Sequence, residues 1–202
     1  MEKLKSVVVL GMVFSAALAF SGCATKVVRP AVEKRIDLSG RWNDVDDRMV
    51  SEEMIKDCLA KPWVDVFAAK NNRQPVVIVG TVRNRSNEHV DAGLFIASLE
   101  RSLTNSGKVK FVAAKGDRDE LRDEKADQAA HAAQASRKAP DSETGADFMV
   151  QGTINSVKDE IDGKYAILYQ VNLEMVDLTT NEKVWIGQKE IKKYVSRKLF
   201  GL

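Results

Sequence analysis

The feature of this sequence that most constrains its fold is an unbroken β-branched apolar run, Val76-Val77-Ile78-Val79. Such a run is typical of a strand that is covered on both faces of its sheet. The apolar character ends in a polar segment, residues 83–89, and a helix is expected from Val90 to about Ser106. The helix prediction depends on large apolar side chains that recur on one face: Leu94, Phe95, Leu99 and Leu103. Strand, polar loop and helix in succession indicate an α/β domain that presents side chains at the end of its sheet.

The polar loop at residues 83–89 is the first candidate for a binding edge. Arg83 and Arg85 offer charged, planar hydrogen-bond donors, and Asn84 and Asn87 add directional amide groups at a rigid strand end. We predict that these residues contact a partner. The alternative is that the segment is a solvated connection.

A second basic group lies near the C-terminus, where Lys192 and Lys193 are accompanied by Lys189, Arg197 and Lys198. The segment is expected to lie on an edge strand, where lysines also discourage aggregation between sheets. We interpret Lys192 and Lys193 as residues that steer a partner electrostatically, with protection of the edge as the alternative.

The N-terminus has the pattern of a secretion signal, which we assign to residues 1–22. Lys3 and Lys5 precede an apolar run that is shorter than a typical transmembrane helix. The run ends Phe20-Ser21-Gly22-Cys23, which resembles the lipobox of bacterial lipoproteins, in which the cysteine is acylated. An ordinary secretory signal followed by an incidental cysteine is the alternative. Ala24 takes the place of the aspartate associated with inner-membrane retention, so the resemblance implies a lipid anchor on Cys23 at the periplasmic face of the outer membrane.

Residues 23–37 are expected to form the lipidated cysteine and a short tether. At full extension, about 14 residues reach no more than about 50 Å. If Cys23 carries lipid, Cys58 has no partner within the chain. Because Cys58 is surrounded in sequence by Met54, Ile55 and Leu59, we expect a buried, inert thiol.

The rest of the chain predicts one α/β domain over residues 38–202, with a mixed sheet of about five strands, flanking helices and a C-terminal antiparallel meander. Residues 43–47 offer caps for a helix that continues to about Leu59. Residues 109–113 form a short strand, and the charged, alanine-rich residues 116–138 form a weakly packed helix or arm. Strands are expected at residues 148–161, 165–175 and 183–191. Asp162-Gly163 is the hairpin signal between the first two of these.

The sequence offers no familiar catalytic, metal or cofactor motif. A net charge of +2 gives no indication of nucleic-acid binding. The acidic trio Asp44, Asp46 and Asp47 lacks the spacing of a calcium loop, and acidic residues are common at helix starts. No phosphate loop, nucleophile elbow or zinc-protease motif occurs. We therefore predict no enzyme, no cofactor and no metal site, with an unrecognised hydrolase built from carboxylates that folding brings together as the alternative.

Several segments in order resemble the LpoB family of penicillin-binding protein activators. The resemblance covers most of residues 38–195 and is carried by Leu38-Ser39-Gly40-Arg41-Trp42-Asn43, Val79-Gly80-Thr81-Val82-Arg83-Asn84-Arg85-Ser86, Asn105-Ser106-Gly107-Lys108, Gly145-Ala146-Asp147-Phe148 and Val184-Trp185-Ile186-Gly187. It implies a domain similar to the N-terminal domain of TolB, on an outer-membrane lipoprotein that binds and activates a bifunctional peptidoglycan synthase. The chain departs from the best-known members in its tether, which contains only Pro30 rather than a long Pro-rich run. A lipoprotein of another envelope assembly, such as the curli-secretion type, is the second hypothesis.

Overall fold

The structure, a computed structural model, describes residues 28–31, 34, 36–138 and 143–196. The chain divides into two units, residues 1–34 and residues 35–202, and every helix and strand described here belongs to the second unit. Its helices are α2 (Asp44–Leu59), α3 (Trp63–Asn71), α4 (Ala92–Asn105) and α5 (Lys115–His131). Its strands are β1 (Val76–Arg85), β2 (Lys110–Phe111), β3 (Phe148–Ile161), β4 (Lys164–Asp177) and β5 (Lys183–Ser196).

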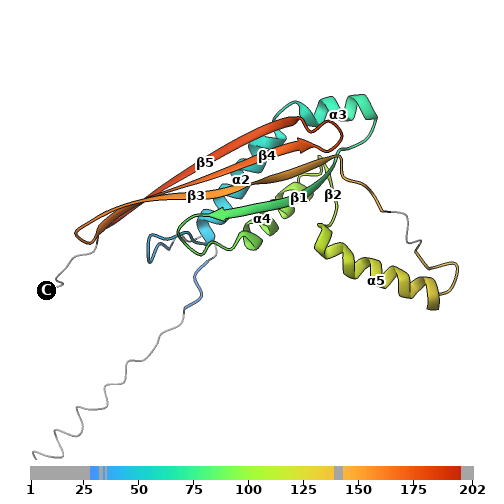
Figure 1. Cartoon of the computed structure of the whole chain (residues 1–202), viewed down its shortest axis with the longest axis horizontal. Helices are drawn as coiled ribbons and strands as arrows, with labels where there is room; N and C mark the ends of the chain where they lie inside the picture. Colours follow the sequence, from blue (N-terminus) through green and yellow to red (C-terminus); the bar gives the residue numbers. More distant parts are fainter. Residues whose placement is uncertain (1–27, 32–33, 35, 139–142, 197–202) are drawn as a thin grey trace, which may run out of the picture. The chain divides into compact units, whose positions relative to one another are not determined.

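The strands form one mixed sheet in the order β2-β1-β3-β4-β5 (Figure 1). β1 is parallel to both of its neighbours, whereas β4 is antiparallel to both β3 and β5. Asp162 and Gly163 make the turn between β3 and β4 with φ angles of 46° and 72°. Both angles are in the left-handed region that a two-residue hairpin requires. The predicted α/β class, the five strands and the C-terminal meander are therefore confirmed.

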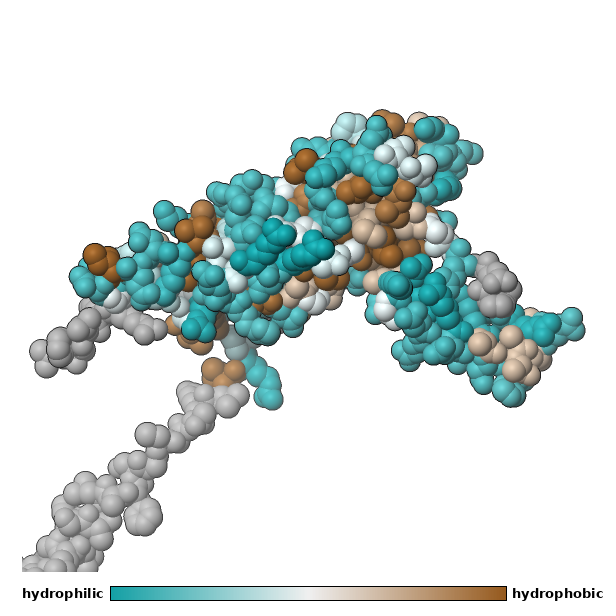
Figure 2. All heavy atoms as spheres, in the orientation of Figure 1, coloured by the Kyte–Doolittle hydropathy of each residue, from teal (hydrophilic) through white to brown (hydrophobic). Residues whose placement is uncertain are grey.

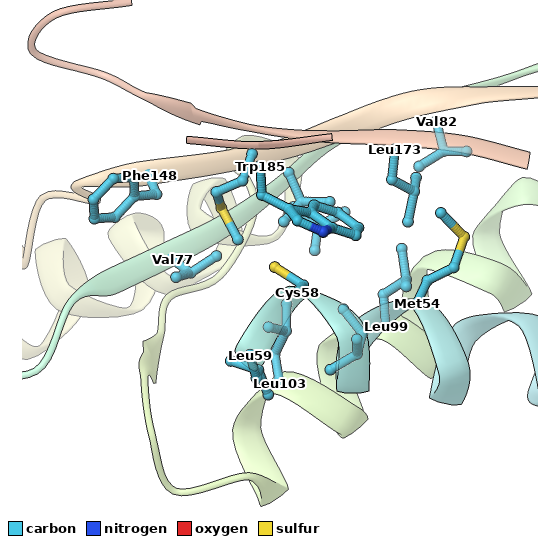
Figure 3. Close-up of a cluster of buried hydrophobic side chains, with 14 of the residues drawn as sticks. Met54, Cys58, Leu59, Val77, Val82, Leu99, Leu103, Phe148, Leu173 and Trp185 are labelled. Carbon is cyan, nitrogen blue, oxygen red and sulfur yellow. The ribbon is translucent and has the colours of Figure 1, made fainter. Parts of the chain in front are cut away.

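α2 and α4 pack on one face of this sheet and build the core with it (Figure 1). Phe95, Leu99 and Leu103 of α4 are completely buried, at the spacing of one helix face. Figure 3 shows Leu99 and Leu103 of α4, together with Met54 and Cys58 of α2, pointing toward the sheet. Burial raises the pKa of the Cys58 thiol to about 12, in agreement with the prediction of a buried, inert cysteine.

β1 is longer than its sequence pattern predicts. Its first part, residues 76–79, is buried throughout, as expected for a covered strand. The strand then continues to Arg85, and Arg83 and Arg85 pair in register with Thr153 and Asn155 of β3. The prediction of a loop from Arg83 onward is wrong because pairing with β3 overrides the weak intrinsic strand preference of polar residues on a solvated face.

The two remaining helices differ in how they pack. α3, which the sequence pattern did not reveal, buries Trp63, and the rings of Trp63 and Phe67 contact Phe148 at centroid distances of 4.9 and 5.2 Å. α5 contains no buried residue, as predicted for a weakly packed, solvated helix. No helix in the described part of the chain has the length and apolar character that crossing a membrane requires.

Candidate functional site

The sheet has one face that α2 and α4 do not cover, which we call the open face. Residues on this face alternate with core residues along each strand, since successive side chains of a strand point to opposite faces. The strand register aligns the open-face residues in two rows across the sheet, one from Arg83 and one from Arg85. The first row is Arg83, Thr153, Asn172 and Gln188, and the second is Arg85, Asn155, Gln170 and Glu190. Figure 2 shows a surface of the folded unit dominated by hydrophilic residues.

Amide side chains on the open face are engaged with one another and with two glutamates. The hydrogen bonds run from Asn155 to Thr153 (3.1 Å), Asn172 to Gln170 (3.2 Å), Gln170 and Gln188 to Glu190 (both 3.0 Å) and Gln151 to Glu174 (2.7 Å). Glu174 also pairs with Lys183 at 2.6 Å, and this contact with the Lys183 ammonium lowers the pKa of Glu174. The network satisfies most polar groups locally and holds the surface in a defined arrangement.

Several cations on the open face have no such partner, and three of them belong to the two basic groups that the sequence suggested. Arg83, Arg85 and Lys192 are exposed, and none of them has an ion pair among the described residues. Arg83 and Arg85 lie on β1 and Lys192 lies on β5, so two strands lie between them and their strands are about 14 Å apart across the sheet. The structure thus brings both arginines of the first sequence-predicted basic group and Lys192 of the second to a single surface.

Lys193 has a different role from its neighbour because it points to the covered face of the sheet. Its ammonium forms ion pairs with Asp46 and with Asp37 (2.7 Å) and donates to the Arg41 carbonyl (2.9 Å). Only 10% of the Lys193 side chain is exposed. The sequence contained a signal for this orientation, since Lys193 has the same strand parity as the buried Trp185 and the half-buried Ile191.

Asn84 and Asn87 mark the point where β1 ends. The Asn84 amide donates to the carbonyls of Glu88 (2.8 Å) and Val90 (3.3 Å), so it shapes the loop, and its contact with a partner stays a prediction. The Asn87 backbone amide donates to Ser156 Oγ (3.1 Å), while the Asn87 side chain is exposed. Both asparagines are exposed, but the amide of Asn84 already has hydrogen-bond partners within the loop.

A buried polar cluster underlies the loop at the end of β1. Tyr169 donates to Glu88 Oε2 at 2.6 Å and accepts the Trp42 backbone amide at 3.0 Å. Burial and the neighbouring Glu88 carboxylate raise the pKa of the Tyr169 hydroxyl. This cluster fixes the loop and the segment around Trp42 to the covered face of the sheet.

The acidic start of α2 is used inside the fold. Asn43 caps the helix, and Asp46 closes a capping box by accepting the Asn43 backbone amide at 3.0 Å. Asp47 accepts from Ser98 Oγ at 3.0 Å. Among the described residues, no three His, Cys, Asp or Glu side chains gather as metal ligands would. Cys23, Arg197 and Lys198 lie outside the described residues.

Comparison with solved structures finds similar domains at low sequence identity. The LpoB C-terminal domain from Escherichia coli shares 20% identity, covering 66% of this chain and 95% of that one, with a TM-score of 0.33. The NMR structure of E. coli LpoB shares 14% identity, covering 85% of this chain and 82% of that one, with a TM-score of 0.41. Lipoprotein GNA1162 from Neisseria meningitidis shares 12% identity, covering 59% of this chain and 83% of that one, with a TM-score of 0.38.

Comparison of sequences gives a more definite result. No curated protein sequence matches the chain. The family model described as peptidoglycan-synthase activator LpoB matches residues 46–191, which run from the first turn of α2 into β5. That span contains the whole helix layer and most of the sheet, and more than half of the chain. The chain therefore belongs to the LpoB family of peptidoglycan-synthase activators.

Proposed function

We propose that this protein is a lipoprotein of the outer membrane that binds a bifunctional peptidoglycan synthase, a class A penicillin-binding protein, and stimulates it. Membership of the LpoB family is the observation that carries the proposal. In this proposal lipid on Cys23 anchors the chain, residues 24–37 span part of the periplasm, and the domain contacts the synthase. The chain acts by binding rather than by catalysis, without a cofactor or metal of its own.

The open face is the docking surface that we propose for the synthase. It carries Arg83, Arg85 and Lys192 without ion-pair partners among the described residues, on a network that holds the remaining polar groups. Arginine forms paired hydrogen bonds with carboxylates, so an acidic surface of the synthase complements this face. Lys192 lies two strands away and adds long-range attraction. Lys193 adds no contact because its ammonium is held by Asp37 and Asp46.

The test measures binding kinetics of the purified protein on an immobilised class A penicillin-binding protein at two salt concentrations. We expect Arg83→Glu with Arg85→Glu to weaken binding by about tenfold or more, mainly through faster dissociation. Lys192→Glu is expected to slow association and to reduce its salt dependence. The matched control is Lys56→Glu with Lys70→Glu, which makes the same change of charge on α2 and α3. If the arginine variant binds like the control, the open face is not the docking surface.

A partner of a different class would contradict the proposal as a whole. Crosslinking in intact cells followed by mass spectrometry identifies the partner without assuming it. Recovery of a peptidoglycan synthase supports the proposal, whereas recovery of a secretion component supports the second hypothesis of another envelope assembly. Family membership favours the synthase.

A further inference from the structure

The last part of β3 has an edge without a strand partner. β1 pairs with β3 only as far as Asn155, and among the described residues β4 alone pairs with residues 156–161. β1 ends there because the Asn84 side chain closes a tight turn, accepting the Ser86 backbone amide at 2.9 Å. The chain therefore turns away from β3 and leaves the edge of residues 156–161 without a neighbouring strand.

The hairpin geometry identifies the backbone groups on this edge. In a two-residue hairpin the pair that closes the turn, here Ile161 and Lys164, exchanges both of its hydrogen bonds. Bonded and non-bonded pairs alternate along an antiparallel ladder, so Asp159 and Val157 also bond to β4. The N–H and C=O groups of Lys158 and Glu160 consequently point to the free edge.

A cleft runs beside this edge on the covered side of the sheet, and we call it the β3 cleft. Its volume is about 730 Å³, and its lining includes Ser39, Arg41, Asn87, His89, Lys158 and Glu160. The walls are fixed, since Tyr165 donates from its hydroxyl to the Ser39 carbonyl and Ser156 accepts the Asn87 backbone amide. The free edge and the cleft thus form one continuous, preformed surface.

Arg41 is the one lysine or arginine lining the β3 cleft that has no side-chain partner among the described residues, and its guanidinium can only donate. Lys158 and Glu160 neutralise each other in an ion pair at 2.5 Å, and Glu88 is occupied by the Tyr169 hydroxyl. Among the described residues, the Arg41 guanidinium and the His89 ring have no hydrogen-bond or ion-pair partner. A ligand that supplies carboxylates and an extended backbone would satisfy both the donors and the edge.

We propose that the β3 cleft binds an extended, acidic peptide segment of a partner protein, which adds to β3 as a further strand. The segment hydrogen-bonds the backbone of Lys158 and Glu160, and one of its carboxylates pairs with Arg41. The other alternate side chains of the segment lie on the open-face side, beside the exposed Val157 and Ile161. Figure 2 shows hydrophobic side chains scattered among hydrophilic ones at the end of the sheet where β3 turns into β4. This inference goes beyond the proposed function, because it holds whichever protein supplies the segment.

The experiment uses a fluorescent hexapeptide of alternating glutamate and valine with blocked ends, and the full-length chain in detergent. Fluorescence anisotropy measures binding, and hydrogen–deuterium exchange locates it. We expect saturable binding with slower exchange in residues 156–161. A peptide N-methylated at every backbone amide is expected to bind at least about tenfold more weakly, since it cannot donate to the edge. The same loss is expected when glutamine replaces glutamate in the peptide.

Matched variants separate the contribution of the backbone edge from that of the Lys158 charge. Lys158→Pro removes an N–H that faces the free edge, a position where strands tolerate proline, whereas Lys158→Ala removes only the ammonium. Proline is expected to weaken binding by about tenfold relative to alanine. Arg41→Ala is expected to weaken binding by about tenfold relative to Arg137→Ala, the control, which removes an exposed arginine outside the sheet and the β3 cleft.

Three outcomes would overturn the inference. Equal affinity for the N-methylated peptide would show that the backbone edge is not used, even if Lys158→Pro failed to fold. Slower exchange confined to residues outside 156–161 would place the peptide elsewhere. A dimer that Lys158→Pro converts to a monomer in sedimentation would assign the edge to a second copy of this chain instead of an acidic partner segment.

Discussion

At the scale of single residues, Lys192 and Lys193 show that neighbours in a strand can serve unrelated purposes. Both are basic residues of β5, yet Lys192 is exposed on the open face and Lys193 is held between Asp37 and Asp46 on the covered face. A reversal of both charges would therefore mix an effect on binding with an effect on stability. Single substitutions separate the two.

Lys193→Met is expected to lower the free energy of unfolding by about 3–5 kcal/mol, because it leaves the buried carboxylate of Asp46 without its counter-charge. The Asp46 side chain is 7% exposed, so water does not replace the lysine. Lys192→Met, the matched control, is expected to change stability by no more than about 0.5 kcal/mol. Urea unfolding of both variants tests this, and equal midpoints would contradict the structural role of Lys193.

Asp47 gives a prediction about pH. Burial raises the pKa of Asp47 above its ordinary value of 3.8, although the Ser98 hydroxyl partly opposes this, and Asp47 Oδ1 has no hydrogen-bond partner within the described part of the chain. The folded state thus binds this proton more tightly than the unfolded chain does. The stability that Asp47 contributes is therefore complete below pH 3.8 and is lost as the pH rises through the raised folded pKa.

Asp47→Asn should cancel this loss because asparagine stays neutral at every pH. We expect the free energy of unfolding of the variant to increase relative to that of the unmodified chain as the pH rises from about 3 to about 7. Urea unfolding across that range measures the difference. A difference that stays constant with pH would show that Asp47 ionises normally in the folded protein.

At the scale of elements, β1 combines two environments in one strand. Val77 and Val79 belong to the core, whereas Arg83 and Arg85 emerge on the open face after an irregularity in the register between Val79 and Val82. A bulge of this kind changes which face the following side chains occupy. It is the reason that the polar end of β1 presents its arginines to solvent while its apolar start remains covered.

A matched pair of isoleucines tests the burial of β1. Ile78 in β1 is 7% exposed, and Ile186 in β5 is 68% exposed. Ile78→Ala is expected to lower the free energy of unfolding by about 2–5 kcal/mol, because it leaves a cavity in packed surroundings. Ile186→Ala is expected to change it by no more than about 0.5 kcal/mol. Thermal and urea unfolding check both values, and a cost for Ile186 equal to that for Ile78 would contradict the burial described here.

At the scale of the whole molecule, the anchor and the domain have separable roles in our proposal. The domain has its own core within residues 35–202, so it does not need the N-terminal segment to fold. Stable anchoring requires more than one acyl chain, since each buried CH₂ contributes about 0.8 kcal/mol. Removal of the lipidated cysteine should therefore change the location of the protein and leave its fold intact.

Cys23→Ser is expected to move the protein from the outer-membrane fraction to the soluble periplasmic fraction. Cell fractionation with immunoblotting measures this, and circular dichroism of the released protein checks its fold. Cys58→Ala is the control, because it removes the buried cysteine and leaves the lipobox unchanged. Retention of the Cys23→Ser protein in the membrane fraction would contradict the lipid anchor.

Several features of the candidate site could not be predicted from local sequence patterns, because they depend on pairing between distant segments. The sequence placed Arg83 and Arg85 in a loop, and only pairing with β3 shows that they lie within a strand. Asn84 is a residue type that often binds partners, yet its amide already forms hydrogen bonds that shape the turn. The β3 cleft joins residues near 40, 88 and 158, which are distant in sequence.

By itself the sequence determined the α/β class, the C-terminal meander, the caps of α2 and the burial of Cys58, because periodicity, turn residues and neighbouring side chains act locally. The tertiary structure decided where β1 ends, which of Lys192 and Lys193 meets solvent, and which polar groups already have partners. The physical reason is that a side chain's face and its hydrogen-bond partners depend on strand register, and register is set by contacts between segments far apart in the chain.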